Sequence, residues 1–500
     1  PSKGMMPGSQ FIRFVWEVNK NNIALNIVSH EESLKSDKKW YYYFKGGEFR
    51  RWYGNRDRVV DYQNDGKNVR HTNGDRNPSL YFKDNINWSK VSGHFAGRTG
   101  LVGGLYDDAA CQCEVFNKTN YKIILGLFNS KVAESLLSAL GESLNFGPGE
   151  VAKLPFVVFE KMKGEVYKLV DCCVTISKSD WDAFETSWDF TKHPLLRNKP
   201  TISEAYAEWE AECNARFAQL KANEEELNSI FIDIYGLQDE LTPEVDDKDV
   251  TVRKADLQRD IKSLLSYAVG CMFGRYSLDV EGLAYAGGTW DESKYVTFKP
   301  DEDNVIPITD EDYFEDDIIG RLIAWLKVVY GAETLEENLR FIADALGTSG
   351  DTARQKIRNY FLKDFFKDHC KIYQKRPIYW LYDSGKQNGF KALIYMHRYN
   401  ADTSGQVRAE YLGKMEETYE SEINRMQDIM DNGAGREVAL AGKRKEKLQK
   451  QLHECRDYDA VLGHIALASI AIDLDDGVKV NYVKVQTAKD GKLLPILAKI

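Results

Sequence analysis

The sequence predicts an α+β protein in which a mixed α/β domain precedes a mainly helical body. Short alternating patterns separated by turn signals fill the first 160 residues, whereas helical periodicity dominates from there to about residue 370. A β-hairpin and then a long helical hairpin follow. For a chain of 500 residues we therefore expect three domains, at 1–160, 161–370 and 371–500.

The first domain is expected to combine short strands with a helix. Residues 11–18 alternate apolar and polar side chains loosely, as a strand does. The segments Asn64–Gly66 and Asn73–Asp75 are turn signals between further strands. An amphipathic pattern over 123–140 predicts the helix, and the Gly-Pro-Gly triplet at 147–149 ends it.

The second domain is expected to consist of helices. Residues 203–234 carry a long amphipathic pattern, and 256–273 and 333–370 predict further helices. The polar segments Ser179–Trp181 and Asn223–Glu226 resemble helix starts, where an oxygen-bearing side chain caps free backbone amides.

Residues 301–317 form an acidic run with nine Asp or Glu and no basic residue. Such a run can bind a divalent cation, although it lacks the glycine and the twelve-residue spacing of an EF-hand loop. Alternatively, it ends in the acidic first turn of a helix over 316–330, where the helix dipole favours negative charge. The second interpretation is favoured, and no metal site is predicted.

The third domain begins with a β-hairpin. Residues 377–382 and 390–396 are two aromatic and β-branched runs joined by a turn over Ser384–Gly389. Residues 407–431 and 436–458 then predict two long antiparallel helices, because the intervening Asn-Gly-Ala-Gly segment breaks helical structure.

The composition, 43% hydrophobic and 29% charged, is that of a soluble globular protein. No apolar run reaches the roughly 18 residues that span a bilayer, and no secretory signal opens the chain, so no membrane partner is expected. The eight cysteines lack zinc-site spacing and are expected to be reduced thiols in the bacterial cytoplasm. Because the chain begins at Pro1 without an initiator Met, we expect it to be a piece of a longer protein.

Charge is distributed unevenly along the chain. The formal net charge is −10, yet residues 1–110 carry a local charge of +5 and the remaining residues −15. A basic N-terminal part on an acidic body is consistent with a protein that binds nucleic acid through one face and has a different function on another.

Residues 40–58 carry the strongest functional signal. Arginine forks match phosphates and the guanine edge, aromatic faces stack on bases, and glycines allow a backbone to approach a phosphate closely. This chemistry indicates a nucleic-acid surface, and the alternative is a half-buried β-hairpin with its arginines in solvent. The predicted DNA-contacting residues of this run are Lys45, Arg50, Arg51, Arg56 and Arg58. Trp52 and Tyr53 are predicted to anchor the loop to the core, with base contact as the alternative.

Two further groups of basic residues are candidate DNA contacts. Further residues that read DNA bases from later loops are predicted to be Arg70, His71, Arg76 and Arg98. A second basic-aromatic run supplies Lys371, Lys375 and Arg376 as candidate second contacts, to DNA or to a partner. Packing of the hairpin is the favoured explanation for the aromatic residues of this second run.

Motifs of an independent catalyst are missing. An N6-amino methyltransferase needs a glycine-rich turn after a strand for S-adenosylmethionine, and Gly103–Gly104 and Gly287–Gly288 do not open a strand–helix unit. A metal-dependent nuclease needs clustered acids and a Glu-x-Lys on a strand, and Glu292–Lys294 keeps this class as a minor alternative. No catalytic residue is predicted, and the chain by itself is expected to be no enzyme and to hold no cofactor.

The segment Lys45–Asn55 resembles the Lys-Gly-Gly-x-x-Arg-Lys-Trp-Tyr-Gly-Asn signature of the PglX family. In that family, the adenine-specific DNA methyltransferases of bacteriophage-exclusion (BREX) systems, the signature opens the target-recognition region. Further stretches that look similar to the family are Gly4–Val18, Leu125–Val132, Asp180–Phe190, Asn223–Pro243, Arg275–Gly288 and Lys371–Tyr399. The resemblance therefore covers nearly the whole chain.

The resemblance implies a DNA target-recognition region and a helical C-terminal body, which hold duplex DNA while the target adenine flips out. The family's S-adenosylmethionine and adenine motifs would precede residue 1, so it implies methylation for a parent protein and for no residue here. Implied partners are double-stranded DNA, the parent's methyltransferase domain, other phage-defence subunits and a DNA-mimicking inhibitor. The alternatives are a protein-interaction scaffold of the defence complex and part of a type IIG restriction–modification enzyme.

Overall fold

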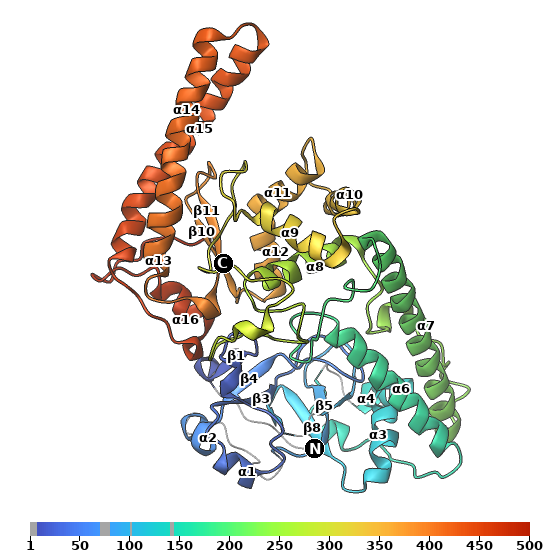
Figure 1. Ribbon diagram of the computed structural model, residues 1–500. Helices are drawn as coiled ribbons and strands as arrows, with labels where there is room; N and C mark the ends of the chain where they lie inside the picture. The colour runs from blue at the N-terminus through green and yellow to red at the C-terminus, as the bar shows by residue number, and fades with distance from the viewer. Residues whose placement is uncertain (1–7, 71–80, 101–102, 141–144) are drawn as a thin grey trace. The chain divides into compact units, whose positions relative to one another are not determined.

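The computed structural model describes residues 8–70, 81–100, 103–140 and 145–500 (Figure 1). It combines helices with small sheets, which confirms the predicted α+β class. The chain forms two compact units, one of residues 1–194 and 207–256 and the other of residues 195–206 and 257–500. The division into three domains stays a prediction.

Two small sheets form the centre of the first unit. The larger sheet has the order β1-β4-β3-β2, with β7 also paired to β3, and the smaller has the order β6-β5-β8. The strands are β1 (Ile12–Phe14), β2 (Ile23–Ala24), β3 (Trp40–Phe44), β4 (Arg58–Asp61), β5 (Asn85–Ser89), β6 (Arg98–Thr99), β7 (Leu105–Tyr106) and β8 (Ala110–Glu114). Strand β3 is paired along both edges, and all of its side chains except that of Tyr42 are buried. The Tyr41 ring contacts those of Tyr62 and Phe82 edge to face.

Helices complete the first unit. They are α1 (His30–Lys35), α2 (Gln63–Arg70), α3 (Tyr121–Phe128), α4 (Lys131–Leu140), α5 (Pro148–Val151), α6 (Lys163–Asp182) and α7 (Ile202–Tyr235), of which α7 belongs to this unit from residue 207 on. The predicted turn at Asn64–Gly66 is present as three residues with positive φ within α2. The predicted turn at Asn73–Asp75 lies outside the described residues.

The single helix predicted over 123–140 is wrong, because the structure has two helices there with a bend of 73° between them. Asn129 stands at the break, and its side-chain amide donates to the carbonyl of Gly97 and accepts from the Gly97 amide. This tertiary contact holds Asn129 out of the helix, although the apolar period continues through it. In the described part of the chain no single helix is long and apolar enough to cross a membrane, and only this bent pair meets the length and composition criteria together.

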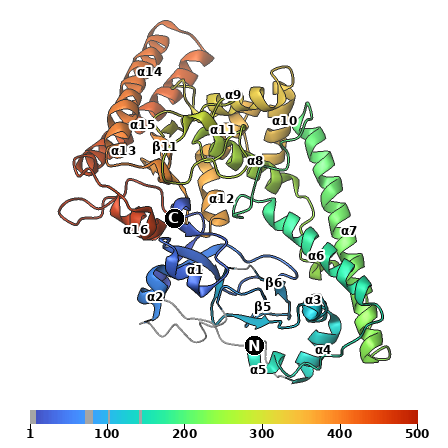
Figure 2. The same cartoon turned by 60° about the horizontal axis from the view of Figure 1, so that its bottom comes forward.

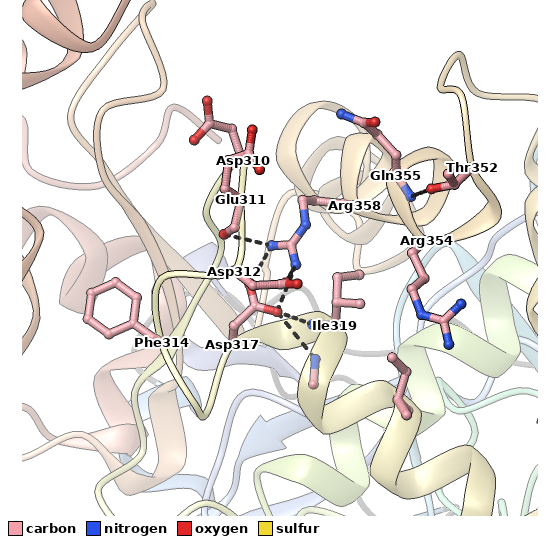
Figure 3. Close-up of a pocket in the computed structure, with 12 residues that line it drawn as sticks. Asp310, Glu311, Asp312, Phe314, Asp317, Ile319, Thr352, Arg354, Gln355 and Arg358 are labelled. Carbon is pink, nitrogen blue, oxygen red and sulfur yellow. Dashed lines mark hydrogen bonds and ion pairs between the residues drawn. The ribbon is translucent and has the colours of Figure 1, made fainter. Parts of the chain in front are cut away.

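The second unit is mainly helical. Its helices up to residue 372 are α8 (Leu257–Met272), α9 (Ile318–Tyr330), α10 (Leu335–Leu346), α11 (Ala353–Lys363) and α12 (Phe365–Ile372). The acidic run ends as predicted at a helix start, because the carboxylate of Asp317 accepts from the amides of Ile319 and Gly320 and caps α9 (Figure 3).

The predicted β-hairpin and helical hairpin are confirmed. Strand β10 (Tyr379–Asp383) pairs antiparallel with β11 (Lys391–Tyr395), and β9 (Ile306–Pro307) pairs with the other edge of β11. Beyond them lie α13 (Thr403–Gln406), a π-helical turn over Val407–Leu412, α14 (Gly413–Asn432), α15 (Arg436–Ala466) and α16 (Gly477–Lys484). Helices α14 and α15 lie side by side along their length (Figures 1 and 2).

Candidate nucleic-acid interface

The signature segment is the loop that joins β3 to β4. The two strands pair antiparallel, but the thirteen residues between them do not close as a tight hairpin. Instead, the Trp52 amide donates to the Gly97 carbonyl over 2.9 Å, and the Thr99 amide donates to the Trp52 carbonyl over 2.9 Å. Trp52 thereby forms a parallel bridge with Arg98 of the smaller sheet. The loop therefore fastens the two sheets together.

One buried carboxylate binds both Arg51 and Trp52. The Arg51 guanidinium donates to Oε2 of Glu224 over 2.8 Å, and the Trp52 indole N–H donates to Oε1 over 2.7 Å. Glu224 lies on α7, and its side chain is 1% exposed. Burial raises the pKa of this carboxyl, and Arg51 and Trp52 offset part of that rise. Both oxygens of Glu224 thus hold the middle of the loop in place.

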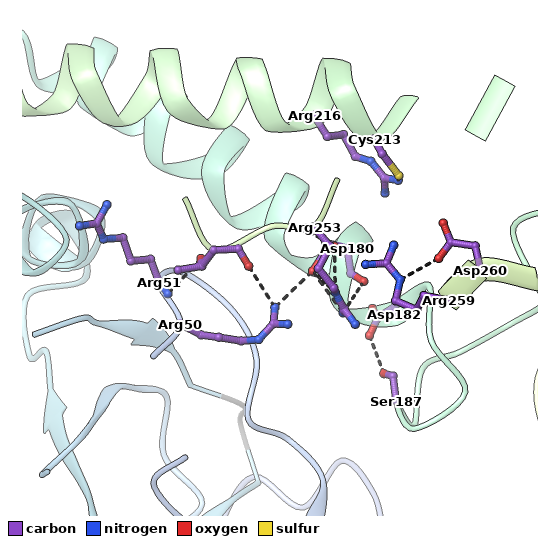
Figure 4. Close-up of polar contacts among 11 residues, drawn as sticks. Arg50, Arg51, Asp180, Asp182, Ser187, Cys213, Arg216, Arg253, Arg259 and Asp260 are labelled. Atoms are coloured by element: carbon purple, nitrogen blue, oxygen red, sulfur yellow. Dashed lines mark hydrogen bonds and ion pairs between the residues drawn. The ribbon is translucent and has the colours of Figure 1, made fainter. Parts of the chain in front are cut away.

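A second carboxylate, Asp180 of α6, binds Arg50 (Figure 4). The Arg50 guanidinium lies 3.2 Å from its Oδ2 and 4.9 Å from the centre of the Trp181 ring. The same carboxylate accepts the backbone amide of Arg253 over 3.0 Å and its guanidinium over 3.2 Å. Burial alone would raise the pKa of Asp180, but Arg253 and Arg50 outweigh it and the pKa is lowered.

Arg56, near the end of the loop, and Arg98 of β6 are both buried. Arg56 stacks on the Tyr53 ring at 3.9 Å and donates to the Thr99 carbonyl over 2.7 Å. Arg98 is 2% exposed, and its guanidinium donates to the side chain of Asn87 over 3.2 Å. Burial lowers the pKa of Arg98 to about 10, with smaller effects from Arg56 and Arg50. Both guanidiniums therefore bind protein atoms.

The glycines of the loop serve close packing. Gly54 has φ +138°, and a Cβ there would lie 2.7 Å from Cδ of Arg50 and 3.1 Å from the Trp181 ring. A Cβ on Gly46 would lie 2.9 Å from the Ala109 carbonyl oxygen. These positions are filled by protein atoms, where the sequence suggested room for a phosphate.

The remaining predicted DNA contacts of the first unit, Lys45 and Arg58, differ in their exposure to solvent. Lys45 is exposed where the loop leaves β3. Arg58 is half-buried, 3.4 Å from the Phe14 ring centre and 3.2 Å from the Asp57 carboxylate. The side chain of Arg70 and all of His71 and Arg76 lie outside the described residues. Of the signature cations, Lys45 is thus the one that the structure places in solvent.

The second basic-aromatic run lies at the end of α12 and before β10. Lys371 and Lys375 are exposed, and Arg376 is half-buried and donates to the Lys375 carbonyl over 2.9 Å. Tyr379 and Trp380 are fully buried in the hairpin, which agrees with the packing explanation for the aromatic residues.

The Glu-x-Lys pattern, which made a nuclease an alternative, does not lie on a strand. Residues Glu292–Lys294 form a 3₁₀ turn, and the Lys294 ammonium donates to the carbonyl of Ala284 over 3.2 Å. The geometry therefore does not support a nuclease at this position.

The sequence interpretation missed the acidic partners of the loop. Both helix starts that it proposed lie inside helices, because Asp180 belongs to the last turns of α6 and Glu224 to the middle of α7. A signal was present, since Asp and Glu seldom lie in the interior unless a cation pairs with them. The pairing itself joins residues 130 and 173 positions apart, which no local pattern reveals.

Comparisons with proteins of known name support the resemblance drawn from the sequence. The chain is 42% identical over 98% of its residues to "Adenine-specific methyltransferase PglX" of Lacticaseibacillus casei (strain Zhang). It is 36% identical over 92% of its residues to "Adenine-specific methyltransferase BrxX" of Escherichia coli O9:H4 (strain HS). The chain spans 42% and 40% of the length of these relatives. No family model matches it.

These names correct two expectations. The chain was expected to be no enzyme and to hold no cofactor, yet the proteins that it matches along nearly all of its length are named methyltransferases. Such enzymes transfer the methyl group of S-adenosylmethionine. The two glycine pairs do not fit that cofactor, because Cβ atoms on Gly103 and Gly104 would meet Ile27 and Phe44 within 2.4 Å, and Gly287 and Gly288 lie in an irregular loop. We therefore assign no step of methyl transfer to these residues.

Proposed function

Because this chain is homologous along nearly its whole length to PglX-type adenine-specific methyltransferases, we propose that its protein methylates adenine in DNA as part of a phage-exclusion system. Within that activity, this chain recognises the target site and holds the duplex while the adenine leaves the stack. The observation that carries the proposal is the match over 98% of the chain. S-adenosylmethionine is the methyl donor of the proposed reaction.

The fixed signature loop supports a recognition role. Two buried carboxylates and a bridge to the neighbouring sheet hold residues 50–54 in one conformation. A loop that is ordered before it meets DNA loses less conformational entropy on binding. We therefore propose that Arg50, Arg51, Arg56 and Arg98 position the recognition surface from behind.

Phosphate contact is then proposed for the exposed cations. Lys45 lies at the start of the loop, and Arg58, at its end, is half-buried. The readers predicted at Arg70, His71 and Arg76 remain predictions on the following segment. Lys371, Lys375 and Arg376 remain candidate contacts of the second unit.

A salt titration tests the proposal. The chain is titrated with a random-sequence duplex in gel-shift assays at rising salt, with wild type beside Lys45→Glu. Losing one phosphate contact should flatten the slope of log K against log salt by about 0.9. Lys153→Glu is the matched control, because Lys153 is also an exposed lysine of the first unit but lies outside the loop. Absence of duplex binding at low salt, or equal effects of the two variants, would contradict the proposed DNA-contacting role of this chain.

A protein-interaction role is the second candidate, and one specific observation favours it. Residues 111–500 carry a local charge of −15, which repels DNA and attracts basic protein surfaces. The two roles are compatible, because they use different residues.

A further inference from the structure

The second unit contains an open cavity of about 400 Å³ between the acidic run and helices α9 and α11 (Figure 3). This volume lies in the range of small binding pockets, about 300–1,000 Å³. Its apolar lining comes from Phe314 in the acidic run and from Ile319 and Ile323 on α9. Such a lining can receive an aliphatic side chain.

The polar lining of the cavity is predominantly acidic. Four carboxylates and two guanidiniums line it, and the side chains of Glu311 and Asp312 are 58% and 83% exposed. Asp310 also lines the cavity, and its side chain is 11% exposed. Among the described residues its buried Oδ1 accepts no hydrogen bond. This oxygen has almost no exposed surface, so the carboxylates that a ligand can reach are those of Glu311 and Asp312.

The acidic run already binds basic side chains of this chain. The other oxygen of Asp310 accepts from Arg444 over 3.1 Å and from Lys447 over 2.5 Å, both on α15. Arg358 of α11 donates to Asp317 over 2.5 Å and also pairs with Asp312. Arg444 lies 3.6 Å from the carboxylate of Glu311. The run therefore already binds arginine and lysine side chains, and the carboxylates of Glu311 and Asp312 are 58% and 83% exposed in spite of their own pairs.

We propose that this cavity is a docking site for a basic segment of a partner protein, which places an aliphatic side chain on Phe314 and Ile323 and a lysine or arginine beside Glu311 and Asp312. Charge complementarity selects the partner, because the exposed carboxylates attract a cation and repel a nucleic-acid phosphate. The proposal goes beyond DNA recognition, and it assigns to the second unit a function that the signature loop does not perform.

The test uses the whole chain and labelled peptides, with binding measured by fluorescence anisotropy. The probe has the core Lys-Leu-Arg between Gly-Ser flanks, and the comparison peptides have the cores Lys-Ser-Arg and Glu-Leu-Glu. We expect the Lys-Leu-Arg peptide to bind best, because it alone satisfies both the rim and the apolar lining. Asp312→Lys should weaken its binding about tenfold, since it places like charges side by side.

Matched variants separate the cavity from general attraction. Glu315→Lys changes the same charge in the same acidic run, but Glu315 does not line the cavity. Ile323→Ala should weaken the Lys-Leu-Arg peptide but not the Lys-Ser-Arg peptide, and Val328→Ala on the same helix should change neither. Ile323→Ala also keeps the test valid if thermal unfolding shows that Asp312→Lys destabilises the fold.

Three results would overturn the docking site. They are equal losses in Asp312→Lys and Glu315→Lys, equal binding of all three peptides, and binding of spermine with the same variant dependence but no binding of peptide. The last result would assign the cavity to a polyamine. Gel shifts with duplex DNA should be the same for Asp312→Lys and wild type, so a failure here is distinguishable from a failure of the DNA-binding proposal.

Discussion

Removing the Arg51 guanidinium is expected to destabilise the fold strongly. The Arg51–Glu224 distance is 2.8 Å, and the two side chains are 8% and 1% exposed. In Arg51→Ala one oxygen of Glu224 keeps the Trp52 indole N–H, but the other loses its cation inside the protein. Breaking a buried ion pair from one side costs about 3–5 kcal/mol, so we expect the free energy of unfolding to fall by that amount.

Urea denaturation of the purified chain at neutral pH measures this change. Lys122→Ala is the matched control, because the Lys122–Asp171 pair of the same unit is also close, at 2.6 Å, but its side chains are 38% and 59% exposed. An exposed pair contributes at most about 1 kcal/mol. If Arg51→Ala cost no more than Lys122→Ala, the inference that Glu224 depends on Arg51 would be refuted.

The pH dependence gives an independent check. The pKa of Glu224 is raised in the folded protein, so the stability linked to its proton is complete below the ordinary glutamate pKa of about 4.3 and is lost as pH rises through the raised value. Loss of Arg51 raises this pKa further. The deficit of Arg51→Ala should therefore shrink as pH falls toward about 4.3. The double variant Arg51→Met with Glu224→Gln should lose less stability than Arg51→Ala, because no buried charge remains in it.

Two further predictions concern the same loop. Gly54→Ala should lower the free energy of unfolding by about 1–3 kcal/mol through positive φ and the short contact to Arg50, whereas Gly149→Ala, with nothing within 4 Å, should have little effect; equal urea midpoints for the two variants would contradict the packing role of Gly54. The lowered pKa of Asp180 means that its carboxylate stabilises the fold above the ordinary value of about 3.9 and that this stability is lost as pH falls through the lowered pKa. Asp180→Asn should therefore be least stable relative to wild type at neutral pH and approach it in acid, and a difference that does not change between pH 7 and pH 3 would exclude the ion pairs as its cause.

Local patterns predicted the C-terminal part well. The β-hairpin of β10 and β11 and the helical hairpin of α14 and α15 depend on neighbouring residues and short turns, so periodicity and turn signals suffice to find them. The helix predicted over 123–140 failed because the side chain of Asn129 binds the backbone of Gly97, which lies just before β6 and is distant in sequence. No local propensity contains that contact.

The candidate site could be predicted only in part. The sequence pointed to the signature loop, and Trp52, for which it predicted an anchoring role, is fully buried. It predicted the arginines as DNA contacts, because a guanidinium in a Gly-rich aromatic run has the same local appearance whether it binds phosphate or a buried carboxylate. Only the fold reveals that α6 and α7 bring Asp180 and Glu224 against them.

The attachment of the loop to α7 also determines how far the chain must extend before the loop can order. A polypeptide ending near residue 160 would have Trp52 and Arg51 but not the carboxylate that both of them bind. Because both of these side chains depend on Glu224, the loop should become ordered only after the helix that carries Glu224 has docked. Truncated proteins for DNA-binding assays therefore need to continue through Arg253, which shares the Asp180 carboxylate with Arg50.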